Sequence, residues 1–113
     1  MLEQKIKDKI IKNSISLEKY GLNDLAWSQE DAKTLINQIM NEKIGILGGD
    51  IYKLTLSRLE SLSENWCCEP IQGESKEEYC FRSKSESLNY IENYPVYPGE
   101  KIIFSITFTE KIG

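Results

Sequence analysis

Apolar residues recur at helical spacing near the start of the chain and again in its middle third. Their repetition at every fourth position, between lysines, predicts an amphipathic helix over residues 3–12. Ser28 has the side chain of a helix N-cap, and the apolar stripe behind it predicts a second helix that runs to about residue 41. Between these helices, residues 15–21 predict a short helical turn and residues 22–27 a packed connector.

A third helix begins at the capping box formed by Ser75 and Glu78, in which each side chain can bond the other residue's backbone N–H. It ends before Pro95, because proline cannot continue a helix. Residues 101–109 alternate strictly between apolar and mixed positions, which predicts a strand of an antiparallel sheet with helices packed on one face.

Shorter apolar runs predict the other strands, at residues 44–47, 50–55 and 64–69. The pair Gly48-Gly49 between the first two predicts a tight turn between the strands or a bulge, and Asp50 follows it directly. Asp50 therefore either caps that turn or contacts a partner. Residues 56–63 fit a strand and a helix equally, since leucines occur there at both spacings.

These elements predict a single α+β domain over residues 1–113, with a small antiparallel sheet and two or three helices packed on one face. The length is enough for one hydrophobic core without a metal or a disulfide. The three cysteines form an odd set with no secretory signal, which indicates reduced thiols and a cytoplasmic location. No run is long enough for a transmembrane helix, so we expect no membrane partner.

The net charge of −4 is unevenly distributed. Residues 1–20 carry a balance of +2, whereas residues 60–78 carry −5, with six glutamates against Lys76 alone. A surface of one sign attracts a partner of the opposite sign and repels nucleic acid. The acidic stretch is therefore either a solvated face that aids solubility or the contact surface for a basic protein.

Catalytic and metal-binding chemistry is poorly represented. The chain has neither a histidine nor a C-x-x-C pair, so we expect no zinc site, and no histidine is available to activate a cysteine nucleophile. The Gly-Gly pair is followed by neither a lysine nor a helix start, as a phosphate loop requires. We expect no enzymatic activity, no cofactor and no metal site, although a carboxylate-dependent enzyme stays possible if a deep polar pocket exists.

Aromatic residues are the remaining candidates for recognition, because tyrosine and tryptophan often anchor protein interfaces. Trp66 precedes the acidic turn, and it is either a core residue or an interface anchor. The residues that we expect to bind a partner are four carboxylates and two aromatic side chains: Asp50, Glu64, Glu69, Glu74, Tyr52 and Trp66.

Four features in this order resemble the immunity protein 40 family of bacterial polymorphic toxin systems. They are the segment Leu22 to Trp27, the helix capped by Ser28, the run Ile46-Leu47-Gly48-Gly49-Asp50-Ile51-Tyr52, and Asn65-Trp66-Cys67. The resemblance covers about residues 15–108. It implies a cytoplasmic protein that binds and neutralises a cognate toxin domain, often a nuclease or another enzyme. The alternative is an acidic adaptor or regulatory subunit without a toxin partner.

Overall fold

The computed structural model describes residues 2–56 and 58–112, and the fold class predicted from the sequence is confirmed. In those ranges the chain forms three α-helices, one 3-10 turn and a five-stranded antiparallel sheet. The elements, in chain order, are α1 (Gln4–Lys12), β1 (Ile15–Ser16), the 3-10 turn η1 (Glu18–Tyr20), β2 (Leu25–Ser28), α2 (Gln29–Gln38), β3 (Ile46–Leu54), β4 (Leu59–Cys67), α3 (Lys76–Asn93) and β5 (Ile102–Phe108).

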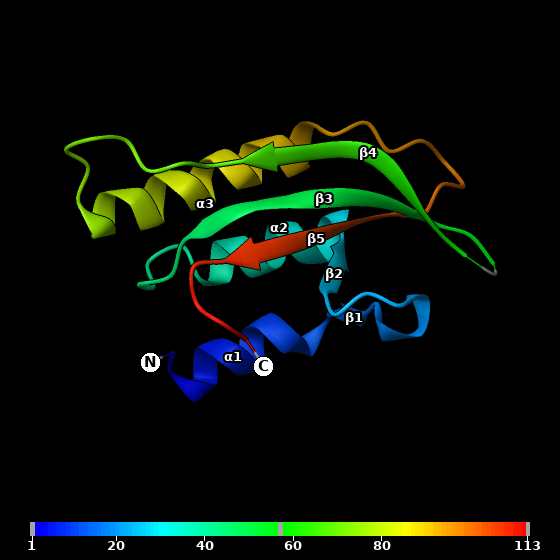
Figure 1. Cartoon of the computed structure of the whole chain (residues 1–113), viewed down its shortest axis with the longest axis horizontal. Coiled ribbons are helices and arrows are strands. Elements are labelled where there is room, and N and C mark those ends of the chain that lie inside the picture. The colour runs from blue at the N-terminus through cyan, green and yellow to red at the C-terminus, as the bar shows by residue number, and fades with distance from the viewer. Residues whose placement is uncertain (1, 57, 113) are drawn as a thin grey trace.

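The strand order is β1-β2-β5-β3-β4, so the last strand of the chain lies in the middle of the sheet. Figure 1 shows β3, β4 and β5 in front of α2 and α3, with α1 beyond the β2 side of the sheet. The main core lies between the helices and the sheet. It includes Ile10 of α1, Ile36 of α2, Ile91 of α3 and Phe104 of β5.

The helix ends follow the local sequence signals. The Ser28 side chain accepts a hydrogen bond from the Asp31 N–H at 3.2 Å, and Ser75 with Glu78 forms the complete capping box. These bonds satisfy backbone N–H groups that have no partner within the helix. The helical turn predicted at residues 15–21 is shorter than expected, because Ile15–Ser16 pairs with β2 and only Glu18–Tyr20 is helical.

The tight turn predicted at the glycine pair is wrong, and the structure has the alternative, a bulge next to the pair. β3 runs without interruption from Ile46 to Leu54, with a bulge in its pairing to β5 between Ile46 and Gly48. Gly49 instead makes room for Trp66 of β4. A Cβ atom at Gly49 would collide with the indole ring of Trp66 and with the backbone oxygen of Ser105.

Two further strands differ from the prediction. The connector at residues 22–27 contains β2, which pairs with β5 from Ser28↔Ile103 to Ala26↔Ser105. β4 begins at Leu59 and not at residue 64, so the described part of the 56–63 stretch is largely strand; Ser57 lies outside the described residues.

The second face of the sheet is partly covered as well. Ile103 of β5 is fully buried with Leu17 and Ala26, although its position in the alternating pattern predicted the uncovered face. The chain around η1 folds over this part of the sheet, and Tyr20 and Tyr52 pack at the border of the small cluster.

A buried lysine joins two helices behind the sheet. Lys84 of α3 is fully buried, and its ammonium group donates hydrogen bonds to the backbone oxygens of Ile39 and Glu42, at 2.8 Å and 2.6 Å. These carbonyls lie just beyond the end of α2, where helix carbonyls lack partners. Burial lowers the pKa of Lys84, because the charged form loses its hydration.

We predict that Gly49→Ala destabilises the fold by about 1–3 kcal/mol or more, because its methyl group would collide with fixed backbone and with a buried ring. Gly73→Asn is the matched control. Gly73 has a φ of +88° and open space around it, and asparagine tolerates that conformation at a cost of about 1 kcal/mol or less. Urea unfolding midpoints measure both effects; equal midpoints for the two variants would contradict the steric role of Gly49.

Candidate partner-binding surfaces

Asp50 and Tyr52 lie on the face of the sheet opposite α2 and α3, which we call the helix-free face. Side chains alternate along a strand, and Ile51 between them points into the main core. Asp50 is exposed and stands level with Ser105 of β5 on one side and Asn65 of β4 on the other. It is therefore in the middle of a strand, which excludes the alternative role of capping a turn.

Negative charge accumulates on this face. Tyr52 is half-buried, and the pKa of its hydroxyl is raised first by burial and then by the nearby carboxylates of Asp50 and Asp24. The ion pairs among residues 2–56 and 58–112 engage other carboxylates, those of Glu3, Glu30, Glu74, Glu86 and Glu100. A carboxylate beside an aromatic ring suits an arginine, which can pair with one and stack on the other.

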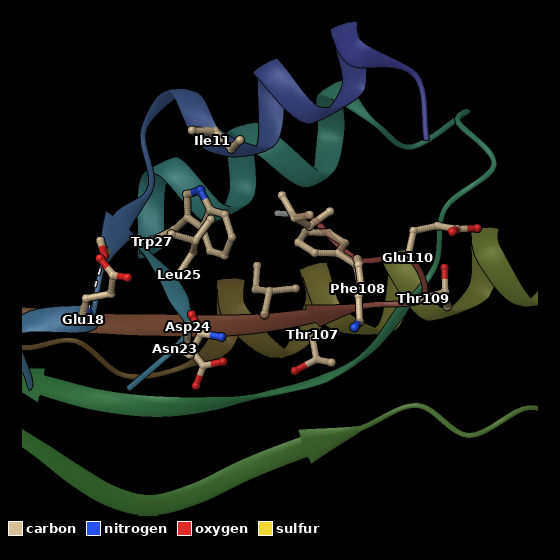
Figure 2. Close-up of a pocket in the computed structure, with 14 residues that line it drawn as sticks. Ile11, Glu18, Asn23, Asp24, Leu25, Trp27, Thr107, Phe108, Thr109 and Glu110 are labelled. Carbon is tan, nitrogen blue, oxygen red and sulfur yellow. Dashed lines mark hydrogen bonds between the residues drawn. The ribbon is translucent and has the colours of Figure 1, made fainter. Parts of the chain in front are cut away.

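A cleft continues the helix-free face at the end of β5. Its volume is about 710 Å³, and it lies between β5, the β1–β2 segment, α1 and the chain after β5. Figure 2 shows Ile11 of α1 facing β5 across Trp27, with Asp24 and Thr107 at the other side. No pattern in the sequence indicates this site, because Asp24 reaches it only through the pairing of the following strand β2 with β5.

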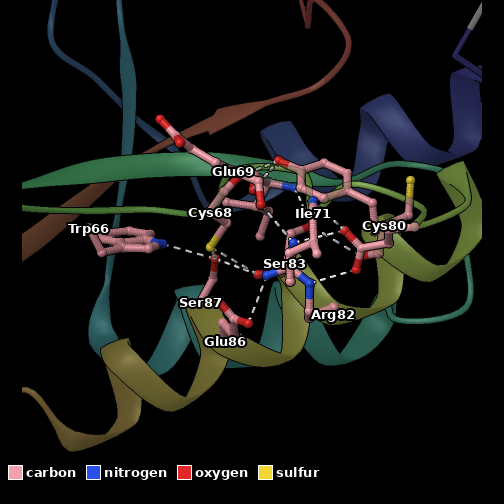
Figure 3. A network of polar contacts seen from close by, with 12 residues as sticks. Trp66, Cys68, Glu69, Ile71, Cys80, Arg82, Ser83, Glu86 and Ser87 are labelled. Carbon is pink, nitrogen blue, oxygen red and sulfur yellow. Dashed lines mark hydrogen bonds and ion pairs between the residues drawn. The ribbon is translucent and has the colours of Figure 1, made fainter.

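Arg82 and Glu86 belong to a network of polar contacts on α3 (Figure 3), and Glu74 joins it through Arg82. Arg82 binds the Glu74 carboxylate through two nitrogens, at 2.6 Å and 2.9 Å, and also contacts the Glu86 carboxylate at 2.8 Å. The same guanidinium donates to the backbone oxygen of Glu69 at 2.7 Å. The bond to Arg82 lowers the pKa of Glu74, whose side chain is only 10% exposed. Glu74 therefore ties the loop after β4 to α3 and presents little of its charge to a partner.

Trp66 lies in the core, not on the surface that an interface anchor requires. It is 8% exposed, its ring stacks on Tyr90 with 5.0 Å between the centroids, and its N–H donates to the Ser87 hydroxyl at 2.9 Å. Neighbouring Glu64 is exposed, but its carboxylate accepts a hydrogen bond from the Tyr94 hydroxyl at 2.6 Å.

The six residues singled out from the sequence thus fall into two groups. Asp50 and Tyr52 come together on the helix-free face, where Asp24 joins them. The other four, Glu64, Trp66, Glu69 and Glu74, lie on the β4–α3 side of the molecule. There most of their polar groups already have partners within the protein, so the first group is the better candidate for a contact surface.

Other chemistry has little support in the described ranges. The described residues contain no group of three or more cysteine or carboxylate side chains placed to hold a metal ion. Cys67 is an exposed thiol, and Cys68 and Cys80 are buried thiols. None of the helices within the described ranges has the length and apolar character needed to cross a bilayer.

Comparison with known families identifies the class of protein as an immunity protein. The family model described as immunity protein 40 matches residues 16–108, which is most of the chain. The chain belongs to the immunity protein 40 family, and the resemblance found in its sequence is confirmed. The partner that such a family implies in general is a protein toxin. Neither the search of curated proteins nor the search of solved structures gave a match.

The bond between Tyr94 and Glu64 predicts a loss of stability at alkaline pH. Burial and the Glu64 carboxylate raise the pKa of Tyr94 above its ordinary value of 10.0. Because the folded-state pKa is the higher one, the contribution is complete below pH 10 and falls above it by about 1.4 kcal/mol per pH unit. The free energy of unfolding, measured by urea titration for the wild type and Tyr94→Phe, should show this as a difference that changes only above pH 10.

Glu64→Gln is the control for the cause of this effect. The amide can still accept a hydrogen bond but carries no charge, so the folded-state pKa of Tyr94 should be lower in this variant than in the wild type. The loss of stability should therefore still begin near pH 10 but end at a lower pH than in the wild type. A difference between wild type and Tyr94→Phe that stays constant from pH 8 to pH 12 would contradict the assignment.

Proposed function

We propose that this protein is an immunity protein that binds a cognate toxin domain and neutralises it by covering the toxin's active surface. The observation that carries the proposal is the family match over residues 16–108. We propose further that the contact surface is the helix-free face around Asp50 and Tyr52, and that the protein acts by binding and not by catalysis.

The charge of this face favours a basic partner. Asp24 and Asp50 lie close to Tyr52, and the ion pairs of the described residues engage other carboxylates. An incoming lysine or arginine would find a carboxylate that is not already paired. Enzymes that act on nucleic acids have basic active surfaces, so a nuclease toxin suits this face, which would occupy the place of the phosphates.

The dimensions are also adequate. A stable interface covers about 800 Å² on each partner, and the described protein has a surface of 7137 Å². A rigid antiparallel sheet presents such an area without reorganisation, and this lowers the entropic cost of association. Half-buried Tyr52, framed by carboxylates, provides an aromatic anchor near the centre of the face.

The proposal is tested by co-expression with the toxin domain encoded beside this gene, with growth and copurification as readouts. Restored growth together with a one-to-one complex is the expected result. Continued killing despite soluble expression would exclude that toxin as the partner. A neighbouring gene without a toxin, combined with capture of a different, non-toxic protein, would favour the adaptor function.

The charge reversal Asp50→Lys should slow association with the toxin domain by about tenfold at low salt, because it replaces attraction by repulsion at the centre of the face. Its matched control is Glu92→Lys, which changes another exposed carboxylate, on α3, with the same change in net charge. Surface plasmon resonance at 50 and 500 mM salt measures both on-rates, and circular dichroism checks that both variants fold.

The difference between the two variants should shrink at high salt, because salt screens exposed charges. Equal on-rates for Asp50→Lys and Glu92→Lys at low salt would remove the helix-free face as the contact surface, even if the wild type protects cells.

A further inference from the structure

The geometry points to a second mode of contact, which rests on the proposed function and makes it more specific. We propose that the cleft at the end of β5 receives an extended, basic segment of the toxin, which pairs as an added strand with the last residues of β5. The segment would alternate apolar side chains, which face the cleft floor, with lysine or arginine, which face its rim.

Beside the cleft, β5 has a free edge that is open only over a short length. The pairing of β2 with β5 reaches no further than Ser105, whereas β5 itself continues to Phe108. On its other side β5 stays paired with β3 up to Ile46↔Phe108. The last residues of β5 therefore have a strand neighbour on one side and the cleft on the other.

The backbone at this edge is oriented toward the cleft. The Thr109 N–H donates to the Gly45 oxygen at 3.0 Å, on the β3 side. Backbone groups of successive residues in a strand point to opposite sides, so the N–H and C=O of Phe108 point away from β3. An added strand would hydrogen-bond to these groups, as extended peptides do at exposed sheet edges.

The rim of the cleft is mainly negatively charged. Of the residues that line the cleft, Glu18, Asp24 and Glu110 carry negative charge and Lys111 alone carries positive charge. The floor is apolar, with Trp27, Ile106 and Phe108 all buried there. On the α1 wall, Ile11 is 46% exposed and lacks cover from the rest of the protein. Together these features fit a segment that is both basic and apolar.

The other edge of the sheet provides a contrast. β4 carries Glu60 and Glu64 along its length, and Ser63 has a φ of +58°, which interrupts the regular strand. Charged residues and irregular backbone are the devices by which proteins prevent unwanted pairing at an edge. The sequence Ile106-Thr107-Phe108 has no charged residue. Compared with the β4 edge, the open end of β5 inside the cleft is therefore better suited to accept a strand.

The cleft also adjoins the contact surface proposed above. Asp24 lines the cleft and also raises the pKa of Tyr52, so it belongs to both regions. Thr107, exposed on the cleft side, pairs with Gly48 only two residues from Asp50. One toxin domain could thus cover the helix-free face and place a segment in the cleft.

The test compares the double variant Glu18→Lys/Glu110→Lys with the control Glu77→Lys/Glu92→Lys, which has the same change in net charge on α3. Calorimetry with the toxin domain should show affinity at least tenfold weaker for the cleft variant than for the control. In the wild-type complex, hydrogen exchange followed by NMR should slow at the Phe108 amide, as expected if an added strand accepts its hydrogen bond. Equal affinities of the cleft variant and the control, together with unchanged exchange at Phe108, would overturn the inference. The proposed function would still stand if the wild-type protein protects cells from the toxin.

A second probe separates this inference from the proposed function. A blocked seven-residue peptide of alternating lysine and valine is added to the ¹⁵N-labelled protein alone, and a peptide of alternating glutamate and valine is the control. Shifts at Thr107 and Phe108 with the lysine peptide only would support the cleft, even if co-expression failed to protect. Absence of such shifts, together with equal affinities in the toxin experiment or with no toxin binding at all, would overturn it.

Discussion

The contact between Trp66 and Gly49 is the constraint on which the arrangement of the sheet depends. The indole crosses from β4 onto Gly49, one of the two glycines of β3, and its N–H reaches Ser87 of α3. Its ring also lies edge-on to Phe104 of β5, with 6.5 Å between the centroids. Three strands and a helix therefore meet at one side chain. This packing holds Trp66, Tyr90 and Phe104 together on the helix side of the sheet.

The sequence predicted the elements that depend only on neighbouring residues in the chain. Ser28 and Ser75 mark helix starts because a cap needs only its own neighbours in sequence. The tight turn predicted at the glycine pair was wrong because Gly49 lacks a side chain for another reason. It makes room for the ring of Trp66, which lies 17 residues further along the chain. β2 was missed for a similar reason, since its four residues are recognisable as a strand only beside β5.

The charged residues of the candidate site could not be predicted from the sequence either. The sequence places six glutamates together at residues 60–78, but folding gives several of them internal partners. Arg82 holds Glu74, Tyr94 bonds to Glu64, and Glu78 completes a cap. Asp24 and Asp50, which are far apart in sequence, both raise the pKa of Tyr52. A count of charges along a chain cannot distinguish carboxylates with internal partners from those that face solvent.

Lys84 also decides which way α3 can face. A buried ammonium group is tolerated only where carbonyl oxygens receive it, and here these belong to Ile39 and Glu42 alone. If α3 slid by one turn or rotated, the charge would be left in an apolar interior, at a cost of several kcal/mol. The lysine thus fixes the position of α3 relative to the C-terminal end of α2. Through that alignment it fixes where Ser83 and Ser87 meet the sheet, although it touches neither the helix-free face nor the cleft.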